Sequence, residues 1–277
     1  TIEYKITVYI ANVWLWIEAF DMWELLGNRI STIYLPDIKR SMLPTIIVEE
    51  LCSLDEGKDR YSFAVDFMVT KTKNSVEIKP HIVKVYQCKI RVKHNFEYEE
   101  SKLLKNRDYK QLADITKQLD SSIRNSHDVV AFWMIKMNEY MALHMRQQQI
   151  GIYRSITISN LQNTSSQNNY NCNSSFIRAW EQKLQGSYVN YDDNSDFNHH
   201  VLGVSQYLHI TSPIRRLIDL LNQILWIYHV VQPSKMREKT ILFVNEQIEL
   251  LPQINDTMKN VRKVQSNCEI LKKVTNE

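Results

Sequence analysis

The feature that most constrains the fold of this chain is a change of hydrophobic pattern about one third of the way along it. Branched and aromatic residues alternate with polar ones around residues 60–70 and 76–93, a pattern that is typical of strands. Beyond residue 97 the apolar residues recur mainly at intervals of three and four, which is typical of helices. A strand-rich first third followed by a mainly helical remainder predicts an α+β fold. We expect one domain over residues 1–277.

The same patterns predict individual elements. Residues 4–17 are expected to form a strand followed by an irregular edge, and residues 45–54 a short helix. Longer helices are expected at 97–119, 127–149, 176–186, 213–231 and 236–275. Residues 155–175 are rich in serine, asparagine and glutamine, which predicts a loop insertion. A solvated surface excursion is favoured there over a functional loop.

Composition excludes some classes of protein. Only five glycines occur in 277 residues, and neither GxGxxG nor GxxxxGK[ST] is present, so a glycine-rich phosphate loop is not expected. The net charge of +3 is too small to indicate a nucleic-acid partner by itself. Glu3, Lys5 and Asn12 interrupt the first apolar run, which disfavours a membrane span. The four cysteines form no CxxC pair, so we expect reduced thiols in a cytoplasmic protein.

The sharpest local signal is TSPIRR at residues 211–216. Ser212 is a good helix N-cap, and Pro213 suits the first helical position because the N–H that it lacks would be unpaired there. Apolar residues follow at helical spacing: Ile214, Leu217, Ile218, Leu221 and Leu225. We therefore expect a helix that starts at Ser212 and packs against a core.

This start would place Arg215 and Arg216 in the first helical turn, where the helix dipole disfavours cations. An anion would explain two arginines in that position, because backbone N–H groups and guanidinium groups together bind phosphate. The alternative is that Arg216 pairs with Asp219, three residues on, and that Arg215 is merely solvated.

The segment that contains this signal, YLHITSPIRRLID at 207–219, closely resembles the signature of the RNB ribonucleases, the ribonuclease II/R family. Five other segments resemble family motifs in the same order along the chain: VYIANV (8–13), IYLPDIKRSMLP (33–44), ELCSLDEGKDRYSFAV (50–65), FEYEE (96–100) and FNHHVLGVSQY (197–207). Six ordered motifs cover nearly the whole chain, which makes coincidence implausible.

The resemblance implies a central sheet with surrounding helices that enclose a channel for single-stranded RNA. Members of the family degrade RNA from the 3′ end to nucleoside monophosphates, using Mg²⁺ held by a cluster of aspartates. Tyr34 matches the aromatic residue that stacks on a base, and Arg215 matches the catalytic arginine near the scissile phosphate. We expect Tyr34, Arg215 and Arg216 to bind RNA. For Tyr34 the alternative is a core tyrosine before a turn.

The sequence departs from the family pattern at the metal-binding and catalytic positions. The family's metal-binding aspartates precede the segment matched by residues 8–13, and this sequence starts at about that strand, so we expect no metal ligand within it. The family's aspartate and histidine in that segment are Asn12 and Tyr9 here, and a later histidine is Gln223. Gln265 lies near the position of a glutamate that supports catalysis.

A metal site rebuilt from other acids is not expected. Asp192, Asp193 and Asp196 lack the glycine and the glutamate of a calcium-binding loop and are interpreted as a solvated acidic loop. Activity as a 3′–5′ exoribonuclease with Mg²⁺ would require aspartates from sequence outside these 277 residues.

We therefore interpret the chain as an N-terminally truncated or degenerate RNB-like domain that binds single-stranded RNA and lacks the family's flanking OB-fold domains. The alternative is a structural or interaction module with a protein partner. Trp14, Trp16 and Trp23 could contribute to such an interface, although core packing is the simpler explanation for most of the tryptophans and tyrosines. Abundant asparagine, isoleucine and lysine hint at an AT-rich genome, so a viral, virion-associated protein is a further hypothesis.

Overall fold

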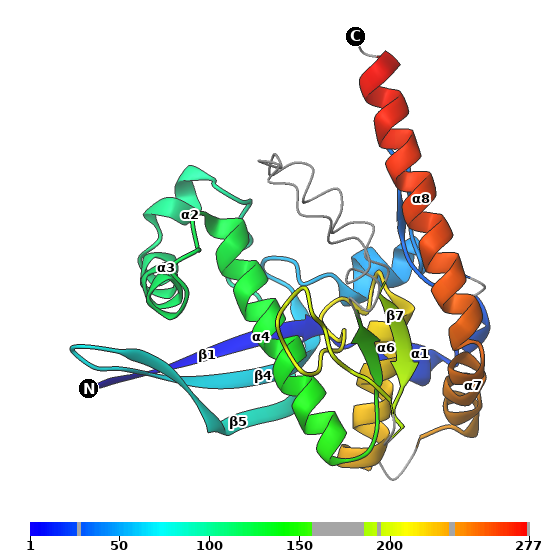
Figure 1. Ribbon diagram of the computed structural model, residues 1–277, viewed down its shortest axis with the longest axis horizontal. Coiled ribbons are helices and arrows are strands. Elements are labelled where there is room, and N and C mark those ends of the chain that lie inside the picture. The colour runs from blue at the N-terminus through cyan, green and yellow to red at the C-terminus, as the bar shows by residue number, and fades with distance from the viewer. Residues whose placement is uncertain (27–28, 157–185, 193–194, 233–235, 276–277) are drawn as a thin grey trace, which may run out of the picture. The chain divides into compact units, whose positions relative to one another are not determined.

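The computed structural model describes residues 1–26, 29–156, 186–192, 195–232 and 236–275 (Figure 1). The chain forms two compact units. The first consists of residues 1–25, 43–138 and 211–214, and the second of residues 26–42, 139–210 and 215–277. The expected combination of a sheet in the first third and helices after it is confirmed, so the fold is α+β.

The first unit contains a three-stranded antiparallel sheet in the order β1-β4-β5 (Figure 1). Its strands are β1 (Ile2–Ala11), β4 (Asp59–Lys71) and β5 (Val76–Arg91). Strands β4 and β5 coincide with the two predicted strands. Phe63 and Val65 lie opposite Ile10 and Val8 in the register. Both β4 side chains are fully buried, and so is Ala64 between them, so the middle of β4 is buried on both faces and does not show the expected alternation.

The strand expected within residues 4–17 is present as β1, but the irregular edge expected after it was wrong, because the chain continues directly into helix α1 (Val13–Phe20). Val13 and Ile17 are fully buried at helical spacing and anchor the helix to the core of this unit. Asp21 closes the helix in the left-handed conformation, and its N–H donates to the carbonyls of Glu18 and Ile17. Burial of one helical face therefore outweighs the strand propensity of this run.

The other helices of the first part of the chain are short, apart from the last. They are η1 (Trp23–Leu26), η2 (Ile46–Cys52), α2 (Ser101–Lys105), α3 (Arg107–Leu119) and α4 (Ser126–Gln147). The helix predicted at 97–119 is two helices, because Asn106 is extended and its side chain accepts a hydrogen bond from the N–H of Tyr109. Asn106 is thus the N-cap of α3.

Helices α3 and α4 pack beside the sheet through one aromatic anchor. Trp133 of α4 is 4% exposed, its ring lies 5.6 Å from that of Phe67 in β4, and its indole N–H donates to Thr116 of α3 at 2.9 Å. Trp133 therefore links α4 to β4 by apolar packing and to α3 by a hydrogen bond.

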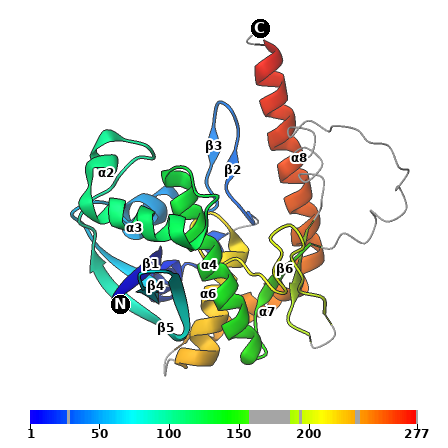
Figure 2. The ribbon, with the colours of Figure 1, turned by 60° about the vertical axis from the view of Figure 1, so that its left-hand side comes forward.

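Apart from the last residues of α4, the second unit has, in its described residues, two small antiparallel ladders and four helical segments. Figure 2 shows β2 and β3 side by side and the helices α6, α7 and α8. The ladders pair β2 (Ile33–Tyr34) with β3 (Lys39–Arg40) and β6 (Ile152–Ser155) with β7 (Ser187–Asn190). The helical segments are α6 (Leu217–Trp226), η3 (Ile227–Val231), α7 (Glu238–Glu249) and α8 (Leu251–Thr275).

The helix predicted over 236–275 is therefore divided at Leu250. Pro252 falls in the first turn of α8, where a missing N–H and a fixed φ do no harm, but it could not continue the hydrogen bonds of α7. Of the predicted loop at 155–175 and the predicted helix at 176–186, only residues 155, 156 and 186 are described; the rest lie outside the described residues. None of the helices that are described is long and apolar enough to span a bilayer.

Candidate nucleic-acid interface

The predicted helix start at Ser212 was wrong: helix α6 begins at Leu217. Residues 213–215 form a turn, and Arg216 is the N-cap with φ −138° and ψ 126°. The extended backbone of Arg216 forms an antiparallel β-bridge with Ser31, which holds it out of the helix. Arg215 and Arg216 therefore precede the first turn of α6 and do not stand within it.

The same bridge joins two of the sequence motifs. The N–H of Thr32 donates to the carbonyl of Arg215 at 2.9 Å, and the N–H of Leu217 donates to the carbonyl of Ile30 at 2.9 Å. These bonds lie on either side of the Ser31–Arg216 bridge. The segment that contains Tyr34 is thus fixed by backbone hydrogen bonds to the segment that contains the two arginines.

Tyr34 follows three residues after the bridge, in β2, and its side chain is 43% exposed. The opposite strand β3 presents exposed Lys39 and Arg40, with Lys39 directly across from Tyr34. Arg215 is also exposed. The alternative of a core tyrosine does not fit this exposure. An aromatic face with cations around it offers stacking and phosphate contacts together.

Arg216 forms the ion pair that was the alternative explanation for its position. Its Nε lies 2.7 Å from Oδ2 of Asp219 and its Nη2 lies 3.0 Å from Oδ1. Asp219 is fully buried in the first turn of α6. Burial opposes the charged form of Arg216, but Asp219 outweighs that effect and raises the pKa of the guanidinium. Two parallel hydrogen bonds fix its orientation.

A second arginine of this unit is more deeply buried. Arg154 in β6 is 4% exposed, and its guanidinium carbon lies 4.9 Å from the ring centre of Tyr188, its cross-strand neighbour in β7. Gly186 makes room for it, since a Cβ there would lie 2.8 Å from the guanidinium carbon. Within the described part of the chain, no carboxylate lies at ion-pair distance from Arg154.

The charge of Arg262 on α8 also acts on Arg154. Burial lowers the pKa of Arg154 to about 10, and like-charge repulsion from Arg262 and Arg216 contributes. The same charges act on His209: burial, then Arg216 and Arg154, hold its pKa well below the ordinary value. The imidazole is therefore neutral at pH 7, and its Nδ1 lies 2.8 Å from the hydroxyl of Tyr188. We call Arg154, Arg216 and Arg262 the arginine cluster.

Two asparagines, Asn222, which is fully buried, and Asn255, which is half-buried, hold β6 and β7 in place. Asn222 in α6 accepts from the N–H of Ile152 at 2.8 Å and donates to the carbonyls of Ile152 and His209 at 2.9 Å. Asn255 in α8 forms bonds of 2.7 and 2.8 Å with the backbone N–H and carbonyl of Tyr188. Each side-chain amide forms the hydrogen bonds that the backbone of a neighbouring strand would otherwise form. Strand β6 is thereby fixed to α6, and strand β7 to α8.

The residues around the arginine cluster do not fit a Mg²⁺ site. Mg²⁺ takes several hard oxygen ligands, whereas the carboxylate here, Asp219, is occupied by Arg216. No group of three or more His, Cys, Asp or Glu side chains suited to a metal ion occurs among the described residues. Of the acidic loop, Asp192 and Asp196 are described and Asp193 lies outside the described residues.

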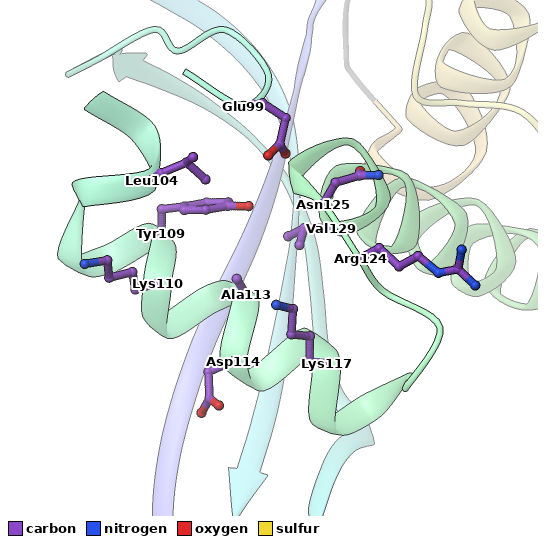
Figure 3. A pocket seen from close by; sticks show the side chains of 10 residues that line it. All are labelled: Glu99, Leu104, Tyr109, Lys110, Ala113, Asp114, Lys117, Arg124, Asn125 and Val129. Atoms are coloured by element: carbon purple, nitrogen blue, oxygen red, sulfur yellow. The ribbon is translucent and has the colours of Figure 1, made fainter. Parts of the chain in front are cut away.

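The first unit has a pocket of its own, of about 290 Å³, between α3 and the start of α4 (Figure 3). Its two acids are already engaged: Glu99 accepts from the N–H of Ser126, and Asp114 pairs with Lys71 at 2.7 Å. Lys117 extends toward Ala113 and the pocket, whereas Arg124 extends away from it (Figure 3). Among the lining residues, Lys117 is therefore a cation that faces this pocket.

Comparison with known proteins gives the class of protein. The RNB domain family model matches residues 1–124 and 108–232, which together are most of the chain. The chain belongs to the RNB domain family. Ribonuclease R of Chlamydia pneumoniae is 24% identical to it over 261 residues, which cover 70% of this chain and 38% of that protein. The chain thus spans well under half the length of this curated relative.

Solved structures share the fold. RNase R of Mycoplasma genitalium in complex with double-stranded RNA matches with a TM-score of 0.71 at 20% identity, covering 96% of this chain and 59% of that one. Dss1 exoribonuclease of Candida glabrata matches with a TM-score of 0.70 at 15% identity, over 96% of this chain and 41% of that one. Yeast Ssd1, a pseudonuclease, gives 0.66 at 14% identity, over 91% and 40%.

Arg154, Tyr188 and Arg262 were not among the residues predicted from the sequence. Each lies far in sequence from TSPIRR, and none stands in a segment with a recognisable spacing. The available signal was an arginine within the apolar run of residues 150–156, because a buried strand seldom carries an unpaired cation.

Proposed function

We propose that the chain is an RNA-binding RNB-family protein whose second unit holds single-stranded RNA. Arg215 and Arg216 are proposed to contact the phosphate backbone and Tyr34 to stack on a base. The observation that carries the proposal is the backbone pairing of Thr32 with Arg215, which ties an exposed aromatic side chain to an arginine pair. An aromatic face next to guanidinium groups is what sequence-tolerant binding to a single strand requires.

The relatives support this proposal. Mycoplasma genitalium RNase R has been solved in complex with single-stranded and with double-stranded RNA, and it shares this fold. The second family-model match, 108–232, runs across both compact units. We propose on this ground that the two units act as one RNB-type domain.

Hydrolysis by these 277 residues is not part of the proposal. Asn12 and Gln223 stand where the family pattern has an aspartate and a histidine, and the side chains beside Arg216 do not fit Mg²⁺. We therefore propose an RNA-binding domain that derives from a 3′–5′ exoribonuclease. If a longer protein supplies aspartates, Mg²⁺ would be its cofactor and Arg215 its catalytic arginine.

The test is binding and cleavage of labelled single-stranded RNA by the purified chain. Binding should weaken steeply as salt rises, because each neutralised phosphate releases counterions. RNA incubated with the chain and Mg²⁺ should stay intact over the same range. Release of nucleoside monophosphates would contradict the non-hydrolytic part of the proposal, and salt-independent or undetectable binding would contradict the RNA-binding part.

A protein-interaction module is the second candidate, favoured by exposed apolar side chains on the last turns of α8. Val264, Ile270, Leu271 and Val274 are 50–66% exposed. Light scattering of the chain at increasing concentration would show self-association through this face. A chain that stays monomeric and binds RNA favours the first candidate.

A further inference from the structure

We propose that the pocket between α3 and the start of α4 binds a small zwitterion, a molecule that carries both an ammonium group and a carboxylate group. Glu99 receives the ammonium group, and Lys117 receives the carboxylate. The inference goes beyond the proposed function, because the pocket lies wholly in the first unit and none of its lining residues is among those assigned to RNA.

The pocket presents one charge of each sign at opposite ends. Figure 3 shows the carboxylate of Glu99 above the pocket and the ammonium group of Lys117 below it, with Tyr109 and Val129 between them. Within the described part of the chain, Glu99 and Lys117 do not approach each other to ion-pair distance. A ligand with both charges can therefore lie between two groups that do not neutralise each other.

The carboxylate of Glu99 is held in place by its own loop. Glu99 has a φ of 60°, in the left-handed region that residues other than glycine seldom adopt. Its N–H donates to Oγ of Ser126 at 3.0 Å, and the N–H of Ser126 donates back to Oε1. That backbone bond uses Oε1, and the Glu99 side chain stays exposed, so Oε2 can accept from a ligand. Unusual backbone conformations that surrounding bonds stabilise are typical of ligand sites.

Lys117 is not neutralised by the acid that precedes it by one turn on α3. Oδ2 of that acid, Asp114, pairs with Lys71 of β4 at 2.7 Å and accepts from Gln118 at 2.8 Å. Figure 3 shows the Asp114 side chain extending away from the pocket. Among the residues that the structure describes, no carboxylate lies at ion-pair distance from Lys117. Its ammonium group is therefore available to the carboxylate of a ligand.

The walls limit the size and the polarity of the ligand. A volume of about 290 Å³ lies at the lower end of the range for ligand pockets, roughly 300–1,000 Å³. Leu104, Ala113 and Val129 offer apolar contacts, and the ring of Tyr109 lies beside them (Figure 3). Leu104 is 42% exposed in the free chain, so an apolar ligand group would cover it. These features fit a free amino acid with an aliphatic side chain.

The first measurement compares L-leucine with two analogues that each lack one of its charges. Isocaproate has no ammonium group and isopentylamine has no carboxylate, so each should bind about threefold to tenfold more weakly than leucine, as loss of one exposed charged contact predicts. NMR shifts of the Leu104 and Val129 methyl groups report binding in this pocket. Equal binding of leucine and either analogue, or unchanged methyl shifts with leucine, would overturn the proposal.

The second measurement assigns each charge to its residue. Glu99→Gln keeps an oxygen for the N–H of Ser126 but removes the charge, so it should weaken leucine binding and leave isocaproate binding unchanged. Lys117→Met keeps the length of the side chain but removes its charge, so it should weaken leucine binding and leave isopentylamine binding unchanged. The opposite dependence on the two analogues would overturn the assignment.

The matched control is Lys110→Met, the same change on the same helix. Lys110 also lines the pocket, but its ammonium group points away from that of Lys117 (Figure 3). This variant should bind leucine as the parent does, with a melting temperature close to that of Lys117→Met. Equal losses of leucine affinity in Lys110→Met and Lys117→Met would show an effect of general surface charge and would contradict a site in this pocket.

Discussion

Arg216 and Asp219 form a two-point ion pair across the start of α6, with Nε to Oδ2 at 2.7 Å and Nη2 to Oδ1 at 3.0 Å. The pair joins the residue that bridges to Ser31 with a fully buried carboxylate in the first helical turn. It therefore sets the orientation of the Arg216 guanidinium and places a negative charge in the first turn of the helix, which the helix dipole favours.

Removing Asp219 should be costly. Asp219→Ala leaves Arg216, largely buried, without its partner, and breaking a buried pair in this way destabilises by about 3–5 kcal/mol. Urea unfolding of the variant measures the loss. The control is Asp256→Ala, which breaks the exposed pair between Lys259 and Asp256 at the same i,i+3 spacing and should cost less than about 1 kcal/mol. Similar losses in both variants would contradict a structural role for the buried pair.

Asn222 should be as sensitive as a residue of the apolar core. Asn222→Ala leaves the N–H and carbonyl of Ile152 and the carbonyl of His209 without the bonds that Asn222 gives them, and each buried orphan costs about 1–3 kcal/mol. The same urea experiment applies, with Asn198→Ala on an exposed loop as the matched amide deletion. An Asn222 variant as stable as the Asn198 variant would show that β6 is held by other contacts.

The fold was predictable where one pattern acted locally. The branched and aromatic runs in β4 and β5 and the helical spacing in α4 come from buried side chains, so these patterns are legible in the sequence. The prediction failed at residues 12–17 and at Ser212, where partners distant in sequence decide the outcome. Arg216 is extended because Ser31 pairs with it, and no local propensity encodes that bridge.

The candidate site was predictable only in part for the same reason. Tyr34, Arg215 and Arg216 were identified because they lie in motifs, and the structure fixes their segments to one another through Thr32. Arg154 and Arg262 stand in β6 and α8, and their proximity to Arg216 depends on how these elements pack. Arg154 differs from a surface arginine because it is buried, and the burial of a residue cannot be read directly from the sequence.

Stability should fall as the pH is lowered from about 6.5 toward 4. Burial lowers the pKa of His199 in the folded chain to about 4. The unfolded chain, with a histidine pKa near 6.5, therefore binds the proton first, and protons favour unfolding in this window. The contribution is fully present above pH 6.5. Unfolding free energies across the window should show a shallower slope for His199→Gln, while His127→Gln, at an exposed position, should keep the slope of the parent. An unchanged slope in His199→Gln would show that other groups govern it.

Gly186→Ala should lower RNA affinity while leaving every side chain of the arginine cluster chemically intact. The added methyl would clash most closely with Cγ1 of Ile156 and would meet the Nε and the guanidinium carbon of Arg154 at 2.8 Å, so both side chains must shift. A loss of affinity is expected in RNA titrations. Parent-like affinity in Gly186→Ala would mean that the position of Arg154 does not affect RNA binding.

The most direct test of the central claim is the salt dependence of single-stranded RNA binding in the parent, Tyr34→Ala and Arg215→Ala. The account predicts a linear fall of log K with log salt in the parent, a slope reduced by about one in Arg215→Ala, and an unchanged slope with affinity lowered by about 1–3 kcal/mol in Tyr34→Ala. Arg107→Ala, at an exposed position of the first unit, should match the parent. Identical slopes and affinities in all four proteins would contradict RNA binding through this surface.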